Sequence, residues 1–259
     1  MAASEEPSKR RNPQERPRRI QDRVYDWLFH NYIWQSVFRS GYPSTPRNQM
    51  LAIATSIFLH LHPTRLHRTH VKIPYTYCLG GLAFFMFLIL TVTGVLLMFY
   101  YVPSTDRAYT DVAALETNVG FGLLMRNLHR WTAHAMVILV FLHMMRVFYT
   151  GAYKPPHEFN WVVGVILLVL TLLLSFTGYL LPWDQLALWA VTVGTNMVGA
   201  GPYLGDEVRL VLLGGYEVGE AALIRFYTLH VLALPLLAAI FMAVHFWRIR
   251  RDGGMAEPL

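Results

Sequence analysis

Four histidines are the residues of this 259-residue chain whose spacing points most directly to chemistry. His129 and His143 stand fourteen residues apart in the apolar stretch 126–146, and His230 and His245 stand fifteen apart in a second apolar stretch. Because an α-helix turns about 100° and rises about 1.5 Å per residue, His129 and His143 share one helix face about 21 Å apart. Two facing helices could therefore ligate two stacked redox centres, His129 with His230 and His143 with His245.

Haem iron is the centre that best suits two histidine ligands. Ligation by two histidines leaves no open position on the iron, which favours electron transfer over oxygen chemistry. Zinc is the alternative, but it usually takes three or four clustered N, S or O ligands. A lone histidine in an apolar helix is more often a packed or hydrogen-bonded side chain. Four at matched spacing, at positions where polar groups are costly, favour ligands.

Glycines repeat the interval of the first histidine pair on two further apolar stretches. Gly80 and Gly94 are fourteen residues apart, and so are Gly164 and Gly178. Glycine in a membrane helix also permits close helix packing, which is the simpler explanation. Since the interval is the same on three helices, we expect these glycines to mark two iron levels, where they let flat macrocycles approach the backbone.

Three arginines flank the first histidine pair. Arg126 and Arg130 lie beside His129, and Arg146 follows His143. They could anchor the helix at the membrane interface, or they could pair with haem propionates through charge-assisted hydrogen bonds. The sequence leaves both roles open.

Composition predicts an all-α membrane protein that positions these side chains. The chain is 54% hydrophobic, and the runs 75–101, 131–149, 161–181 and 226–247 approach the ~20 residues that span a bilayer. One cysteine excludes an internal disulfide framework. The net charge of +6 does not indicate nucleic acid, because the basic residues cluster beside the apolar runs.

The chain divides into three expected regions. Residues 1–21 are basic and proline-rich, and we expect them to be disordered. Residues 22–72 contain amphipathic segments, at 22–40 and 50–62, expected to lie at the membrane interface. Residues 73–259 form a four-helix di-haem bundle with an N-terminal amphipathic helix before it. The long loop 182–224 between the third and fourth helices should carry short helices on the outer surface.

The charges of the loops predict orientation. Arg146 and Lys154 lie between the second and third spans, and three arginines follow the fourth span. The positive-inside rule places these segments, with both termini, in the cytoplasm. The chain is thus expected to be a multi-pass protein of a bacterial cytoplasmic membrane.

Several motifs resemble the b6 type of the cytochrome b family from about Tyr75 to the C-terminus. They are YCLGG at 77–81, HRW at 129–131, GYLLPWDQ at 178–185 and RFYTLH at 225–230. The fifteen-residue spacing on the last helix is also similar to that type. The resemblance implies two haem b groups, held near the outer side by His129 and His230 and near the cytoplasmic side by His143 and His245.

The resemblance assigns further residues. Cys78, which residue type alone would make a small buried apolar side chain, matches a cysteine that holds a covalent haem c, and Arg250 matches an arginine near that haem. Tyr179, Pro182 and Trp183 would lie near the outer quinol site. This chain has no PEWY motif, so a separate three-helix subunit is expected to supply it.

The implied function is that of the haem-carrying core subunit of a quinol–cytochrome c or plastocyanin-type reductase, with transmembrane electron transfer coupled to proton translocation. Expected partners are a Rieske iron–sulfur protein, the PEWY-bearing subunit, a c-type cytochrome or plastocyanin-like acceptor and membrane lipid, in a dimeric complex. Two alternatives stay open: a cytochrome b anchor subunit of a membrane dehydrogenase or hydrogenase, and a transporter or assembly protein with structural histidines.

Overall fold

The computed structural model describes residues 20–29, 31–32, 45–56, 68 and 72–252. The chain separates into two compact units, residues 1–59 and 60–259. Each unit is considered by itself. The second unit contains all four histidines identified above.

The first unit contributes two short helices, α1 (Ile20–Phe29) and α3 (Pro46–Thr55). The hydroxyl of Thr45 caps α3 by accepting a hydrogen bond from the Asn48 amide, and proline at the first helical position suits a helix start. An amphipathic helix was expected over 22–40, and the segment 50–62 was expected to lie at the interface or against a partner. Most of the rest of both segments, and the expected disordered stretch up to residue 19, lie outside the described residues.

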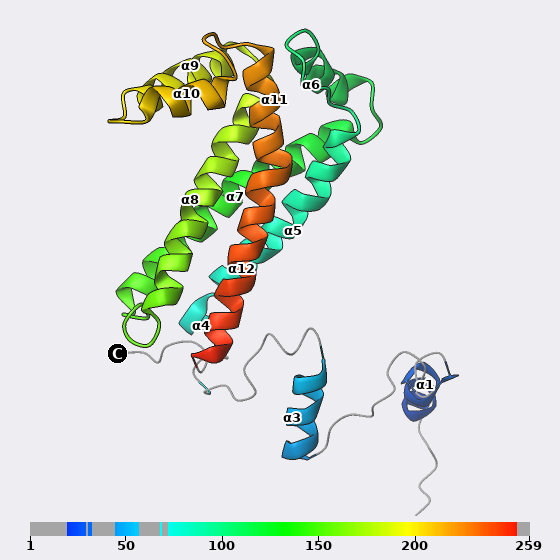
Figure 1. Cartoon of the computed structure of the whole chain (residues 1–259). Helices are drawn as coiled ribbons and strands as arrows, with labels where there is room; N and C mark the ends of the chain where they lie inside the picture. Colours follow the sequence, from blue (N-terminus) through cyan, green and yellow to red (C-terminus); the bar gives the residue numbers. More distant parts are fainter. Residues whose placement is uncertain (1–19, 30, 33–44, 57–67, 69–71, 253–259) are drawn as a thin grey trace, which may run out of the picture. The chain divides into compact units, whose positions relative to one another are not determined.

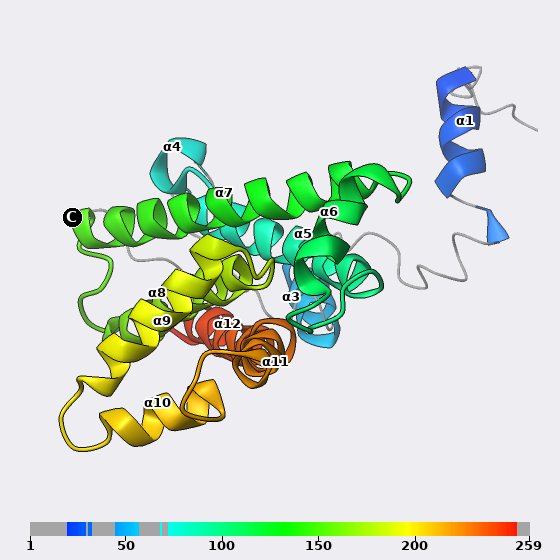
Figure 2. The same cartoon turned by 90° about the horizontal axis from the view of Figure 1, so that it is seen from above.

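Four long helical rods make up the second unit. They are α5 (Leu79–Met98), α7 (Gly122–Tyr149), α8 (Glu158–Leu180), and a rod in which α11 (Glu220–Thr228) and the π-helical turn η2 (Leu229–Ala233) lead into α12 (Leu234–Arg251) (Figures 1 and 2). Each rod is long and apolar enough to cross a membrane. No strand occurs in the described part of the chain, so the predicted all-α fold with four spans is confirmed.

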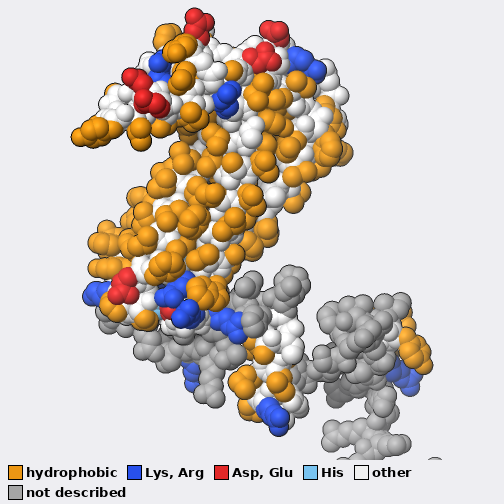
Figure 3. Space-filling model, viewed as in Figure 1, with side chains coloured by type: hydrophobic (Ala, Val, Ile, Leu, Met, Phe, Trp, Pro, Cys, Tyr) orange, Lys and Arg blue, Asp and Glu red, His pale blue; other side chains and the backbone are white. Residues whose placement is uncertain are grey.

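The rods pack side by side in pairs. Helix α5 lies along α7, α8 lies along α12, and α7 contacts α8. At most 22% of the residues in any spanning window are buried within the chain. Figure 3 shows hydrophobic side chains over the middle of the bundle and charged side chains at its ends. This distribution suits a bundle whose apolar side chains meet lipid, cofactors or other subunits.

The helices do not begin where the apolar runs begin. Helix α7 begins at Gly122, nine residues before the run 131–149, because its first turns contain Arg126, Asn127 and Arg130, which interrupt the apolar pattern. Helix α5 begins at Leu79 because Tyr77 and Cys78 adopt left-handed backbone angles, with φ of 49° and 53°. Such angles are uncommon for residues other than glycine, and they separate α5 from the short helix α4 (Ile73–Thr76).

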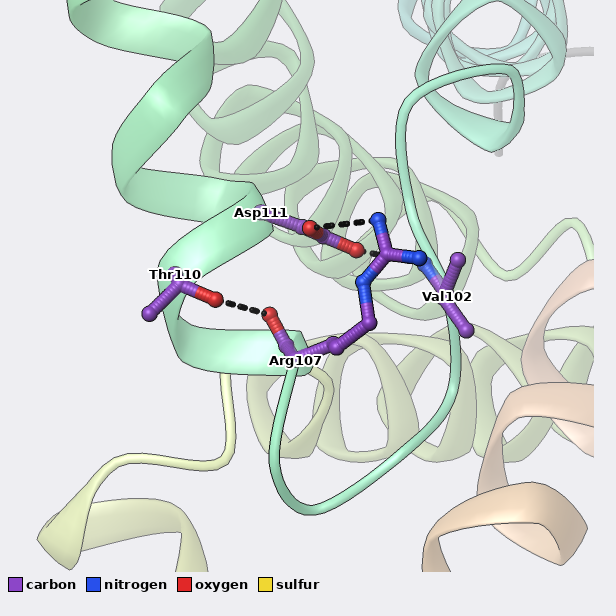
Figure 4. Close-up of polar contacts among 4 residues, drawn as sticks. All are labelled: Val102, Arg107, Thr110 and Asp111. Carbon is purple, nitrogen blue, oxygen red and sulfur yellow. Dashed lines mark hydrogen bonds and ion pairs between the residues drawn. The ribbon is translucent and has the colours of Figure 1, made fainter.

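Short helices gather at one end of the bundle. Helices α9 (Gln185–Gly199) and α10 (Gly205–Leu213) occupy the loop where short helices were expected. Helix α6 (Ala108–Thr117) was not predicted, because its acidic residues suggested a loop. Its first turn is held by Asp111, which accepts hydrogen bonds from the Val102 amide and the Arg107 side chain (Figure 4).

The core of the second unit lies at this same end. Leu180, Val191, Leu213 and Phe226 are almost fully buried there, with Trp183 packed against them. Tyr101, which follows α5, makes two further contacts at this end of the bundle.

The hydroxyl of Tyr101 donates a hydrogen bond of 2.7 Å to the Leu181 carbonyl, and its ring stacks on Tyr227 at 5.5 Å. Burial raises the pKa of Tyr101, and the neighbouring Tyr227 and Asp111 raise it further. The phenol therefore stays protonated and able to donate. One hydrogen bond and one ring contact thus fasten the end of the first span to the third and fourth.

Candidate functional site

The four histidines meet as two facing pairs between the rods. The ring centroids of His129 on α7 and His230 in η2 lie 6.3 Å apart. Those of His143 on α7 and His245 on α12 lie 6.4 Å apart. All four rings are half-buried. The structure therefore brings together the residues that spacing alone had paired.

Both separations fit one metal ion between two imidazoles. A ligating imidazole nitrogen lies about 2 Å from its metal and about 1 Å from its own ring centre, so two opposed rings have centroids roughly 6 Å apart. In the described part of the chain, no three His, Cys, Asp or Glu side chains cluster. The donor set is thus two pairs of nitrogen ligands, which suits haem iron better than zinc.

Each histidine also faces one of the four spaced glycines. A methyl group placed on Gly80 would lie 3.2 Å from the Cε1 atom of His143, and one on Gly94 would lie 3.3 Å from that of His129.

On the opposite side of the bundle, methyl groups on Gly178 and Gly164 would lie 2.5 Å and 3.9 Å from the Cε1 atoms of His230 and His245. The glycines therefore stand at the levels of the histidine pairs, as the shared interval predicted. They leave room at each level that a Cβ atom would fill.

Two threonines that the sequence reasoning missed hold the first histidine pair. The hydroxyl of Thr93 donates to the Ile89 carbonyl, so its oxygen accepts from the Nδ1 atom of His129, 2.8 Å away. The Nδ1 atom of His230 lies 3.1 Å from the Leu174 carbonyl, which can only accept.

The second threonine, Thr177, stands 3.2 Å from the Nδ1 atom of His230. A proton on Nδ1 leaves the Nε2 lone pair of each ring free to bind a metal, as is usual for metal-ligating histidines. The available signal was the Thr-Gly dipeptide, which occurs at 93–94 and again at 177–178. At the level of His143 and His245, the residues before Gly80 and Gly164 are leucine and valine, which have no hydroxyl group.

The arginines have different surroundings. Arg146 donates from Nε to the Tyr75 carbonyl and stacks on the Tyr75 ring, yet its Nη2 is buried without a partner in the described residues. Arg126 forms an ion pair with Glu116 of α6, while Arg130 is exposed. Of these three arginines, only Arg146 presents a buried donor without a partner among the described residues, which an anionic group could satisfy.

Cys78 and Arg250 lie close in sequence to the residues of the second pair. Cys78 is an exposed free thiol two residues before Gly80, which faces His143. Arg250 is in the last turn of α12, five residues after His245.

The three residues expected near a quinol site do not share one environment. Tyr179 is exposed on the last turn of α8. Pro182 and Trp183 lie in the turn between α8 and α9, where Trp183 has a left-handed backbone and packs against the core. The two pockets described are lined by residues between 204 and 229 and include none of these three side chains.

Residues 65–253 match the family model described as Cytochrome b/b6/petB. Cytochrome b6 of Porphyra purpurea is 48% identical over 190 residues, which cover 73% of this chain and 87% of that protein. Cytochrome b6 of Gracilaria tenuistipitata var. liui is 47% identical over 237 residues, covering 92% and 99% of the two chains. The protein of that name in Heliobacterium mobile is 44% identical over 198 residues, covering 76% and 91%.

One solved structure, described as a hyperthermophilic respiratory Complex III, superposes with a TM-score of 0.65 at 28% identity. The alignment covers 88% of this chain and 55% of that one, so this chain spans about half the length of that structural relative. The family match exceeds half of the chain, and the proteins of Porphyra purpurea and Gracilaria tenuistipitata are aligned over most of their length. Together with the two facing histidine pairs, these findings show that the chain belongs to the cytochrome b family.

Proposed function

We propose that this chain is the haem-carrying core subunit of a quinol oxidoreductase complex that transfers electrons to a c-type cytochrome or a plastocyanin-like protein. The observation that carries the proposal is the pair of histidine couples, 6.3 and 6.4 Å between ring centroids, each ring facing a glycine. Relatives named cytochrome b6 and a structural relative named for respiratory Complex III support the assignment to such a complex.

Two haem b groups would be held by His129 with His230 and by His143 with His245. Haem bound in this way supplies reversible one-electron chemistry at two depths of the membrane, with no iron position left open for oxygen. The four glycines leave room beside the ligands. The unpartnered Nη2 of Arg146 would donate to a haem carboxylate near the second histidine pair. Arg126 and Arg130 would donate to haem carboxylates near the first pair.

Cys78 would carry an additional, covalently attached haem c. Its exposed thiol is free to form a thioether bond. The left-handed turn at residues 77–78 directs the chain away from the start of α5, and Gly80 on the first turn of that helix faces His143. Arg250, at the end of α12, would lie close to this haem.

Oxidation of quinol would take place at the opposite end, near Tyr179, Pro182 and Trp183. Tyr179 is exposed at the end of α8, and a partner subunit would supply the other wall of the site. We propose a PEWY-bearing three-helix subunit for that role and a Rieske iron–sulfur protein as the first electron acceptor, in a dimeric complex embedded in lipid. Proton release there and uptake on the other side would build a gradient.

The orientation follows from charge. Arg248, Arg250 and Arg251 end α12, and Figure 3 shows basic side chains gathered at that end of the bundle. On the positive-inside rule, this end and both termini would lie in the cytoplasm. We propose a bacterial cytoplasmic membrane as the location. The end that carries α6, α9 and α10 would face outward.

A haem-stained denaturing gel, together with optical spectra of the purified complex, tests this function. The wild-type complex is expected to contain two b-type haems per copy of this chain and one haem that stays with it after denaturation. In Cys78→Ala the covalent band should vanish while the b-type absorbance remains. A purified complex without b-type absorbance would exclude the proposed function, whereas a missing covalent band alone would exclude only the haem c.

Removal of the Thr93 hydroxyl should weaken haem binding at the first pair. Thr93→Val keeps the side-chain volume but takes away the acceptor for the Nδ1 proton of His129. Loss of a hydrogen bond to a metal-ligating histidine typically costs about 10- to 100-fold in affinity. The less basic ligand should also raise the midpoint potential of that haem. Redox titration and haem retention during purification measure both effects.

Thr91→Val is the matched control for this prediction. Thr91 lies on the same helix and its hydroxyl bonds only the Phe87 carbonyl. Its replacement should leave haem retention and potential at the wild-type values. Equal behaviour of the two variants would show that the Thr93 hydrogen bond does not position His129.

A further inference from the structure

The fourth rod contains one residue more between its histidines than the second. His230 and His245 are fifteen residues apart, whereas His129 and His143, and both glycine pairs, are fourteen apart. In a regular α-helix each residue adds about 100° of turn. One extra residue would therefore rotate His245 about 100° away from His143 if His230 faced His129.

The π-helical turn η2 contains the first of these histidines, His230. It spans Leu229–Ala233, and the Leu234 amide donates to the Leu229 carbonyl five residues earlier. A π turn thus contains one residue more than an α turn. Because Pro235 has no amide hydrogen, it cannot donate to the Val231 carbonyl as an α-helix would require. No other π segment occurs among the described residues.

The histidine positions before and after the turn show that the extra residue does not rotate His245 away from His143. The two histidine pairs have almost equal centroid separations, 6.3 and 6.4 Å. Gly178 and Gly164, fourteen residues apart on α8, face His230 and His245, which are fifteen apart. Equal register at both levels would not be possible if the fourth rod were α-helical throughout.

We propose that η2 and Pro235 form a register device, in which the π turn takes up the fifteenth residue and Pro235, as a positioning residue, holds the turn in place. The device keeps His230 and His245 at the two levels fixed by the other three helices. This inference rests on the proposed function insofar as the two levels are haem sites. It predicts that a residue can be removed from the turn, but not from the helix that follows it.

Two single-residue deletions of equal length test the device in the full complex. Leu232 in the turn and Ala239 in α12 are both exposed on the surface of this chain. Deletion of Leu232 lets the turn become α-helical and leaves His245 facing His143, so two b-type haems per chain should remain. Deletion of Ala239 leaves the turn intact and rotates His245 by about 100°, so one b-type haem should remain.

The readouts are pyridine haemochrome content per chain and the low-spin, bis-histidine EPR signals of the two haems. A wild-type complex with fewer than two b-type haems would overturn the proposed function itself. If the wild-type complex has both haems and the two deletions give equal haem content, including none, the register inference is wrong.

A substitution that preserves chain length provides the second test. Pro235→Ala restores the amide that an α-helix needs at this position, so the turn loses the constraint that holds it. The haem at the His143–His245 level should then be lost several-fold faster on incubation with apomyoglobin, while the other haem is lost at the wild-type rate. Unchanged loss of both haems would overturn the role given to Pro235.

Discussion

Replacement of His143 by alanine is expected to reduce the b-type haem content from two per chain to one. The change removes one of two facing ligands and leaves His245 alone at its level, because no other imidazole faces that ring in the described part of the chain. The pair of His129 and His230 should be unaffected, since its rings lie nearly four helical turns away. Pyridine haemochrome content and the loss of one low-spin EPR signal measure the outcome.

His134→Ala is the control for this prediction. His134 lies on the same helix, but its ring is exposed and contacts Trp131 rather than another histidine. Its replacement should keep both haems. If His143→Ala retained two b-type haems with unchanged EPR signals, the assignment of His143 and His245 as ligands would be wrong.

The repeated interval of fourteen made most of the site predictable. A helix converts that interval into two positions on one face, so histidines and glycines alone indicated which residues would meet. The four spans could also be predicted, because a run of ~20 apolar residues is typical of a helix that spans a membrane. The starts of α5 and α7 could not be predicted. One depends on left-handed angles at Tyr77 and Cys78, and the other lies before charged and polar residues that interrupt the apolar pattern.

Other features became visible only in three dimensions. Helix α6 depends on Asp111 meeting the Val102 amide and Arg107, contacts that composition does not encode. Thr93 and Thr177 acquire their roles only when opposing helices bring histidines to them. The fifteen-residue spacing did not predict the π turn at Leu229–Ala233, which only the structure shows.

Gly178→Ala is expected to disturb haem binding more than alanine at any of the other spaced glycines. The added methyl group would lie 2.5 Å from the Cε1 atom of His230, whereas carbon atoms prefer about 3.5–4.0 Å. Overpacking of this kind costs about 1–3 kcal/mol, which corresponds to roughly 5- to 150-fold in affinity. The haem held by His129 and His230 should be the one released, as measured by haem transfer to apomyoglobin.

Two neighbouring glycines on α5, Gly80 and Gly81, are expected to tolerate alanine better than Gly178 does. A methyl group on Gly80 would lie 3.2 Å from His143, so Gly80→Ala should weaken the other haem by less than Gly178→Ala weakens its own. Gly81 has nothing within 4 Å of such a methyl group. Because alanine favours a helix over glycine by about 1 kcal/mol, Gly81→Ala should retain both haems and unfold no more easily than the wild type. Equal haem loss from all three variants would mean that altered helix packing, rather than the space beside each ligand, explains why glycine occupies these positions.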